Sequence, residues 1–122
     1  MRRVFLVLAL TVGLVSQATN AQDYSYKGYE IITVAGTAIG FTSTLITNVP
    51  TAQGTAQATV AICTLETANI RFTVNGTTPT SAVGVLWTSG SDKTFVGNDI
   101  LRAFRSIRVG SSAALDCHYF GN

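Results

Sequence analysis

The side chains that could carry out acid–base or metal chemistry are few in this chain. His118 is its single histidine, and Asp116 lies two residues before it, so the two would share one face of a strand. A metal centre or an acid–base pair needs further ligands or partners, and the neighbouring sequence offers none. We therefore expect His118 and Asp116 to form part of a solvated polar face.

Other residue patterns typical of enzymes are missing from the sequence. The six acidic residues are scattered, so the fold alone would have to bring together a pair of glycosidase carboxylates. No serine lies in a nucleophile elbow, and no glycine-rich phosphate loop leads from a strand into a helix. The sequence predicts a protein that is not an enzyme and that uses no cofactor and no metal.

Cys63 and Cys117 are the only two cysteines. In an oxidising compartment, an even pair of cysteines predicts a disulfide, and two buried free thiols are the alternative. Closing a loop of this length would stabilise the folded domain by about 4 kcal/mol in the chain-entropy model.

Residues 1–21 have the pattern of an export leader. Arg2 and Arg3 precede an apolar run at residues 4–15, which is shorter than the roughly 20 residues that span a bilayer. Small residues follow, and either Ala18 or Ala21 could be the cleavage point. An uncleaved anchor is the alternative. The leader predicts a secreted, periplasmic or cell-surface protein, with the virion as the alternative location and no membrane attachment after cleavage.

The charge of the remaining 101 of 122 residues is balanced. Six basic residues oppose six acidic ones once Arg2 and Arg3 are set aside with the leader, so the domain gives no reason to expect nucleic acid or an anionic membrane as a partner. Three of the basic residues, spaced by three, could form a phosphate- or sulfate-binding stripe on a helix. A strand after Phe104 would scatter them, and we expect a solvated face. These residues are Arg102, Arg105 and Arg108.

The chain after the leader has the pattern of an all-β domain. Residues 70–74 and 113–119 alternate between apolar and polar side chains, as a half-buried strand does. Residues 58–65 are apolar on both faces, which predicts a central strand covered on both sides. Further short strands are expected at residues 31–34, 38–42, 45–49, 83–88 and 93–96, with a loop at residues 50–57.

One segment breaks the strand period. Ile100, Leu101 and Phe104 would share one face of a short helical turn that Asn98 could cap. The predicted fold is an antiparallel, jelly-roll-like β-sandwich of about seven or eight strands with this one helical turn. It is expected to occupy residues 31–122, preceded by a polar N-terminal arm at residues 22–30.

Three stretches of the second half resemble a known group of proteins. They read CTLETANIRFTVNGTTPT at residues 63–80, DILRAFRSIRVG at 99–110 and LDCHY at 115–119. Together they are similar to small β-sandwich proteins of tailed-phage virion gene clusters. The resemblance implies a structural component of the head-decoration or fibre-associated kind, with no catalytic residues. The chain departs from that pattern at Asn75, where Asp is usual. The larger departure is the leader, which favours an exported relative or a host-encoded domain of the same fold.

Two groups of residues are candidates for a binding surface. Tyrosines at nearly alternate positions could stack on sugar rings, add a strand to a neighbouring subunit or cover a sheet edge. The turn signal at Asn75 and Gly76 opens a loop that could also be a contact surface. We expect a non-enzymatic structural or surface-display subunit that self-associates, and a monomeric carbohydrate- or surface-binding module is the alternative. The candidate residues are Tyr24, Tyr26, Tyr29 and Trp87, with Asn75, Thr77 and Thr78 in the loop.

Overall fold

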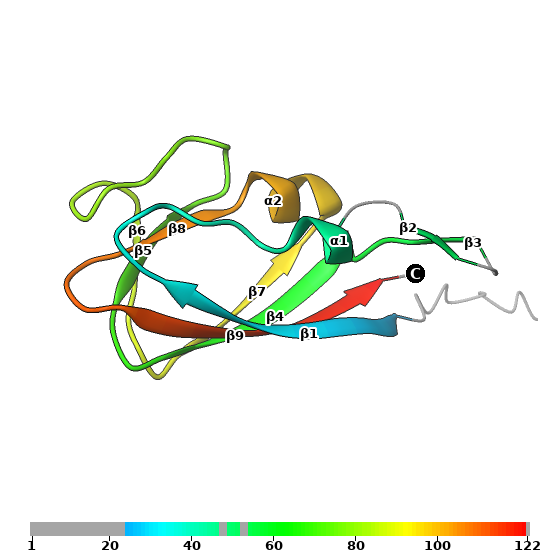
Figure 1. Cartoon of the computed structure of the whole chain (residues 1–122), viewed down its shortest axis with the longest axis horizontal. Coiled ribbons are helices and arrows are strands. Elements are labelled where there is room, and N and C mark those ends of the chain that lie inside the picture. The colour runs from blue at the N-terminus through cyan, green and yellow to red at the C-terminus, as the bar shows by residue number, and fades with distance from the viewer. Residues whose placement is uncertain (1–23, 47–48, 52–53, 122) are drawn as a thin grey trace, which may run out of the picture.

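The computed structural model describes residues 24–46, 49–51 and 54–121. Seven strands form two antiparallel sheets, which confirms the predicted all-β sandwich (Figure 1). The four-stranded sheet has the order β1-β9-β4-β7, and the three-stranded sheet has the order β6-β5-β8. The strands of the first sheet are β1 (Ser25–Val34), β4 (Val60–Glu66), β7 (Asp92–Val96) and β9 (Ala113–Gly121). Those of the second sheet are β5 (Ile70–Thr73), β6 (Val85–Trp87) and β8 (Arg105–Arg108).

The core between the two sheets is rich in aromatic rings. Phe41 and Phe104 stack with ring centroids 4.1 Å apart, and Phe95 packs edge-on against Phe104 at 5.1 Å. Trp87 and Tyr119 are also buried among these rings. Large aromatic side chains contribute most of the apolar area that a small domain can bury, so this cluster is the main source of its stability.

The disulfide joins two neighbouring strands of one sheet. Cys63 in β4 and Cys117 in β9 lie directly opposite one another, with their Cα atoms 4.2 Å apart. Both residues are fully buried on the inner face of the sheet. The predicted pairing is therefore present, and it ties the two central strands of the four-stranded sheet together.

The predicted helical turn is present, but the prediction that Asn98 caps it is wrong. Helix α2 (Asn98–Ala103) buries Leu101 against the core. Gly97, with φ of +114°, occupies the cap position, and no side chain caps the helix. The Asn98 side chain points elsewhere and donates hydrogen bonds to the carbonyl oxygens of Ile46 and Ala58, at 2.6 and 3.1 Å.

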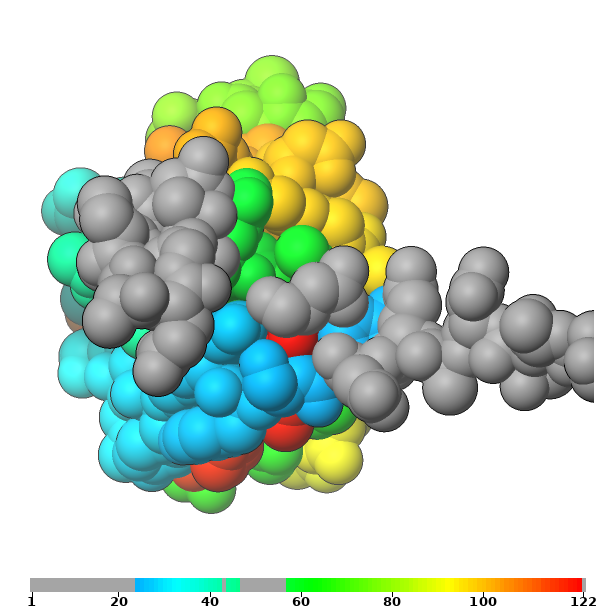
Figure 2. All heavy atoms as spheres, turned by 90° about the vertical axis from the view of Figure 1, so that its right-hand side faces the viewer, coloured from blue at the N-terminus to red at the C-terminus, as the bar shows by residue number. Residues whose placement is uncertain are grey.

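The first half of the domain differs from the prediction at several segments. Residues 25–30, expected in a separate arm, are the first part of β1 and pair with β9, because a neighbouring strand satisfies their backbone groups (Figure 2). Residues 45–49 were expected to continue a sheet, but residues 45 and 46 are the end of helix α1 (Ser43–Ile46). The expected loop at residues 50–57 contains most of a separate hairpin, β2 (Val49–Thr51) with β3 (Gly54–Ala56).

Strand β4 is covered on one face only. Its inner residues are fully buried, whereas Ile62 on the outer face is 43% exposed. The prediction that both faces would be covered is wrong, because no layer of described residues packs on the outside of this sheet. The predicted leader lies outside the described residues. Among the described residues, no helix is long and apolar enough to cross a membrane.

Candidate binding site on the outer face of the four-stranded sheet

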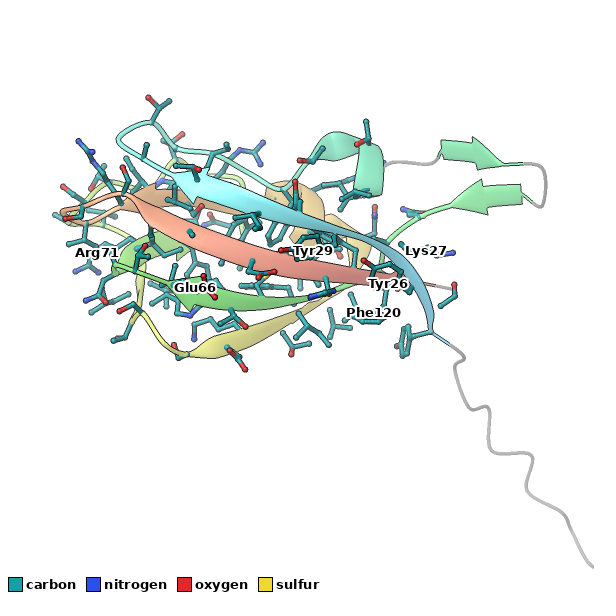
Figure 3. All side chains as sticks on the ribbon, turned by 60° about the horizontal axis from the view of Figure 1, so that its bottom comes forward. Tyr26, Lys27, Tyr29, Glu66, Arg71 and Phe120 are labelled. Atoms are coloured by element: carbon teal, nitrogen blue, oxygen red, sulfur yellow. A yellow bond between two sulfur atoms is a disulfide. The ribbon has the colours of Figure 1, made fainter. Side chains whose placement is uncertain are left out.

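A β-bulge in β1 places Tyr26 and Tyr29 on the same face of the sheet. Tyr26 pairs with Phe120 and Gly28 pairs with Tyr119, so Lys27 is an extra residue in the ladder. Side chains three positions apart in a regular strand point to opposite faces, and one extra residue restores them to the same face. Figure 3 labels Tyr26 and Phe120 near the end of the sheet where β1 begins, with Tyr29 further along β1.

The strand register assembles three rows of side chains on this outer face. We define the outer face by these rows, each running across the sheet from β1 through β9 and β4 to β7. Side chains directly opposite one another on neighbouring strands are close enough to interact, so each row is a line of contacts. The first row is Tyr26, Phe120, Val60 and Val96; the second is Tyr29, His118, Ile62 and Thr94; and the third is Ile31, Asp116, Thr64 and Asp92.

The β1 half of the outer face carries an aromatic ridge, made of Tyr26, Tyr29 and His118. The His118 ring lies between the tyrosines, with centroids 6.1 Å from Tyr26 and 4.9 Å from Tyr29. Tyr26 also meets Phe120 edge-on at 5.8 Å. Tyr26 is 58% exposed and Tyr29 46%. The ridge is therefore held by ring contacts while leaving aromatic surface open to a partner.

The β4–β7 half of the same face carries an apolar groove. The groove is shallow and has a volume of about 470 Å³. Its floor lies over the two strands farthest from the ridge, and Phe120 in β9 closes the side nearest to the ridge. The lining residues are Tyr24, Val60, Ile62, Thr94, Val96 and Phe120.

The outer face is less polar than the sequence predicts. His118 and Asp116 do share it, but the histidine is flanked by tyrosine rings and pairs with Ile62, while Asp116 pairs with Ile31. Desolvation, followed by the nearby Asp116 carboxylate, raises the pKa of Tyr29 above its ordinary value. One carboxylate oxygen of Asp116 is buried and has no hydrogen-bond partner among the described residues.

Trp87 is not part of any binding surface, which corrects the sequence-based expectation. Its side chain is 1% exposed, and its indole N–H donates to the carbonyl oxygen of Ser91 at 3.2 Å. The ammonium group of Lys93 lies 5.7 Å from its ring centroid. Burying the chain's only tryptophan stabilises the core more than exposing it would, so Trp87 is a packing residue.

The Asn75 loop lies at the end of β5 in the other sheet, away from the tyrosines. The Asn75 side-chain oxygen accepts hydrogen bonds from the backbone N–H and the hydroxyl of Thr77, at 3.1 and 2.6 Å. Asn75, Thr77 and Thr78 are all exposed. A small hollow of about 240 Å³ beside Asn75 is lined by Val74 and Val85, among others. The hydrogen bonds of Asn75 account for the turn. The tyrosine surface and the Asn75 loop, both predicted as binding surfaces, are separate in space.

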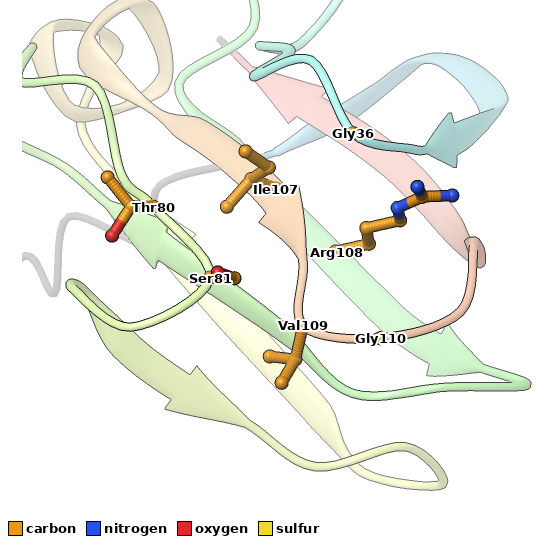
Figure 4. Close-up of a pocket in the computed structure, with 7 residues that line it drawn as sticks. All are labelled: Gly36, Thr80, Ser81, Ile107, Arg108, Val109 and Gly110. Carbon is orange, nitrogen blue, oxygen red and sulfur yellow. The ribbon is translucent and has the colours of Figure 1, made fainter.

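A third hollow lies between the two loops that follow β5 and β8. It has a volume of about 430 Å³, and its lining includes Arg108 on one side of β8 and Thr80 and Ser81 on the other (Figure 4). Arg108 is its only charged lining residue. Arg102 lies in α2 and Arg105 in β8, so the three arginines do not form a stripe. A single exposed guanidinium is too little to define an anion site.

A half-buried carboxylate on β1 accepts several structural hydrogen bonds. Glu30 accepts hydrogen bonds from the Tyr119 hydroxyl and from the backbone N–H and hydroxyl of Thr42. Burial, followed by the Glu30 carboxylate, raises the pKa of Tyr119 well above its ordinary value. Within the described part of the chain, no three His, Cys, Asp or Glu side chains are grouped to hold a metal ion.

Several residues of the outer face were missed by the sequence reading. Phe120 could have been found by extending the alternation of residues 113–119 by one position, because that places it with Asp116 and His118. Ile62 and Val96 were placed in strands, but nothing local indicated that their faces are exposed. The chain matches no protein-family model, no curated protein and no solved structure. Its function must be argued from geometry.

Proposed function

We propose that this chain is an exported, non-enzymatic structural or surface-display subunit that self-associates through the outer face of its four-stranded sheet. The observation that carries the proposal is the exposure of large apolar side chains there: Tyr26 and Val96 are each 58% exposed and Ile62 43%. In an antiparallel sheet with one solvent-exposed face, apolar and polar residues normally alternate along each strand, and the polar ones face the solvent. A contiguous apolar patch on a small soluble protein is typical of an interaction surface.

The size of the outer face suits a second copy of the chain. The strands β1, β9, β4 and β7 have 10, 9, 7 and 5 residues, which gives a face of about 500 Å² at about 3.4 Å per residue and about 4.8 Å per strand. Two such faces in contact would bury about 1,000 Å² in total, which is the size of weak or transient protein–protein interfaces. The pairing would therefore be modest in affinity.

Two of the four edges of these sheets, those at β7 and β6, are poorly suited to pairing with another strand. Edge strand β7 carries Lys93 with its side chain turned inward over Trp87 and Phe72. Inward-pointing charges and very short edge strands are the usual means by which proteins block edge-to-edge pairing. Edge strand β6 has only three residues. Among the described strands, this favours a contact through the outer face.

Export is supported by the disulfide and by the leader pattern. A buried disulfide such as Cys63–Cys117 is typical of proteins from oxidising compartments. A cell-surface or periplasmic assembly fits both features. A virion component, which the resemblance of residues 63–119 implies, is the alternative location.

The aromatic ridge supports one alternative function, a monomeric carbohydrate- or surface-binding module. Two half-exposed tyrosine rings about a histidine offer flat apolar surfaces with polar tips, which is the arrangement that stacks on sugar rings. Trp87 has no role in such a site because it is buried.

The test is the molar mass of the mature, oxidised protein by size exclusion with light scattering, over a range of concentrations. We expect a concentration-dependent mass above that of one chain. Ile62→Lys should shift the protein to the monomer, since it places a charge in the centre of the outer face. Leu86→Lys is the matched control, because Leu86 is 49% exposed but lies on the other sheet.

Two results would overturn the proposal. One is a wild-type protein that stays monomeric at every concentration. The other is equal self-association in wild type and Ile62→Lys. A monomer that binds glycans on an array, and loses that binding in Tyr29→Ala, would support the alternative function in its place.

A further inference from the structure

The two halves of the outer face differ in shape, with exposed rings on one half and a shallow hollow on the other. The aromatic ridge stands on the β1 side, and the apolar groove is hollowed on the β4–β7 side, at the same end of the sheet. A surface that carries both a ridge and a matching groove can pair with an identical copy of itself. In a two-fold contact of this kind, each ridge-to-groove contact occurs twice.

We propose that two copies pack face to face about a two-fold axis parallel to the strands, so that Tyr26 of each copy enters the apolar groove of the other beside Val96. The inference rests on the proposed self-association and adds its geometry. With this axis, β1 of one copy crosses over β7 of the other, and β9 crosses over β4. Two sheets packed in the aligned way, at about 30° to one another, keep these strand pairs in contact near the axis.

The rows of the outer face match in this arrangement. Each row lies over the same row of the second copy in reverse order, so Tyr26 meets Val96 and Phe120 meets Val60. In the third row, Asp116 lies over Thr64 rather than over another carboxylate. In the first row, apolar side chains are thus buried against apolar ones. In the third row, Ile31 lies over Asp92, which is an exposed residue of edge strand β7.

A two-fold axis perpendicular to the strands fits less well. It reverses the order of the rows, so the aromatic first row would cover the row that contains Asp116 and Asp92. Burying carboxylates under aromatic and aliphatic side chains without hydrogen-bond partners is costly. One Asp116 oxygen already lacks a partner among the described residues. The perpendicular axis would place Phe120 over this carboxylate, whereas the parallel axis places Thr64 there, whose hydroxyl can donate a hydrogen bond.

A charge exchange between ridge and groove tests this geometry. Tyr26→Lys and Val96→Glu change two residues that are each 58% exposed, so both variants should fold. Alone, each variant would bury two unpaired charges per dimer, and we expect its self-association to weaken by roughly 100-fold. In an equal mixture, the mixed dimer has one Lys–Glu contact and one unchanged Tyr–Val contact. We expect its affinity to return to within about tenfold of wild type.

The measurement is sedimentation or light scattering of each variant and of the mixture, with one variant carrying a fluorescent label. A mixture of Tyr26→Lys with Leu86→Glu is the control, because Leu86 lies on the other sheet and should give no rescue. A cysteine pair serves if the charges disturb folding: mixed Tyr26→Cys and Val96→Cys should cross-link to one another in preference to themselves.

The outcomes separate the two proposals. If wild type is monomeric, the proposed self-association fails. If wild type associates but neither the charged mixture nor the cysteine mixture forms the mixed dimer, the outer face is used with a different geometry and this inference is wrong. Rescue specific to the Tyr26–Val96 combination supports the parallel two-fold axis.

Discussion

At the scale of single residues, the hydrogen bonds of Glu30 join two neighbouring strands of the four-stranded sheet to the segment before α1. The carboxylate sits on β1 and accepts from Tyr119 in β9 and from Thr42 in the segment that leaves β1. A carboxylate taken out of water is tolerated when several donors surround it. These hydrogen bonds therefore replace the water contacts that the Glu30 carboxylate loses. They also connect β1, β9 and the segment that contains Thr42.

Replacing Tyr119 by Phe should lower stability and change its dependence on pH. The loss of a hydrogen bond to a carboxylate should cost about 2 kcal/mol of unfolding free energy. The folded protein raises the pKa of Tyr119 above its ordinary value of 10.0 and so holds the phenol proton more tightly than the unfolded chain does. Wild type should therefore keep this contribution below pH 10.0 and lose stability as the pH rises further.

Urea unfolding measured between about pH 8 and about pH 11 checks this prediction. The unfolding free energy of the Tyr119→Phe variant should fall less steeply with pH than that of wild type. Part of the fall that remains is caused by Tyr29, whose pKa is also raised. Tyr26→Phe, on the exposed ridge, is the control for loss of a hydroxyl. The prediction fails if wild type and Tyr119→Phe decline in parallel.

At the scale of the elements, the two edges of the four-stranded sheet are protected differently. On β7, the Lys93 ammonium group lies over the rings of Trp87 and Phe72, at 5.7 and 5.8 Å. On β1, the bulge at Lys27 interrupts the ladder near the strand's beginning. Bulges and inward charges both make an edge a poor template for another strand.

Lys93→Val should therefore increase aggregation with little loss of stability. The lost cation–π contacts should lower the unfolding free energy by no more than about 1 kcal/mol. Without the inward charge, edge strand β7 can pair with strands of other chains. We therefore expect more light scattering at high concentration and on prolonged incubation. Lys93→Arg keeps the charge and is the matched control. Equal scattering from the Val and Arg variants would show that the inward charge does not protect this edge.

At the scale of the whole molecule, one covalent link closes much of the chain. The Cys63–Cys117 bond spans 54 residues and includes β5, β6, β7, α2 and β8 within its loop. The core of a domain of this size is modest, so a constraint on the unfolded chain is a large share of the net stability.

The double variant Cys63→Ala/Cys117→Ala should lose about 4 kcal/mol of unfolding free energy, measured by urea denaturation. Reduced wild-type protein should lose a similar amount, which separates the effect of the bond from that of the alanine side chains. Unfolding midpoints that do not differ between oxidised wild type and the double variant would contradict the prediction. Loss of self-association is also expected once part of the population is unfolded.

The sequence by itself determined the kind of fold and much of the local structure. Alternation in residues 113–119 gave β9, the break in period gave α2, and the even cysteine pair gave the disulfide. The strand and the helix depend on the pattern of neighbouring residues. The disulfide follows from the presence of only two cysteines, whatever their positions in the fold. The alternation also showed that Asp116 and His118 share a face.

Only the tertiary structure decided which faces are covered and which segments join them. Trp87 is buried and Ile62 is exposed, although both lie in apolar strand patterns, because burial depends on whether a second layer packs on that face. The bulge at Lys27 changes the face of Tyr29, and it arises from pairing with a strand about 90 residues away. The outer face draws its rows from β1, β4, β7 and β9, so no local pattern could have revealed it.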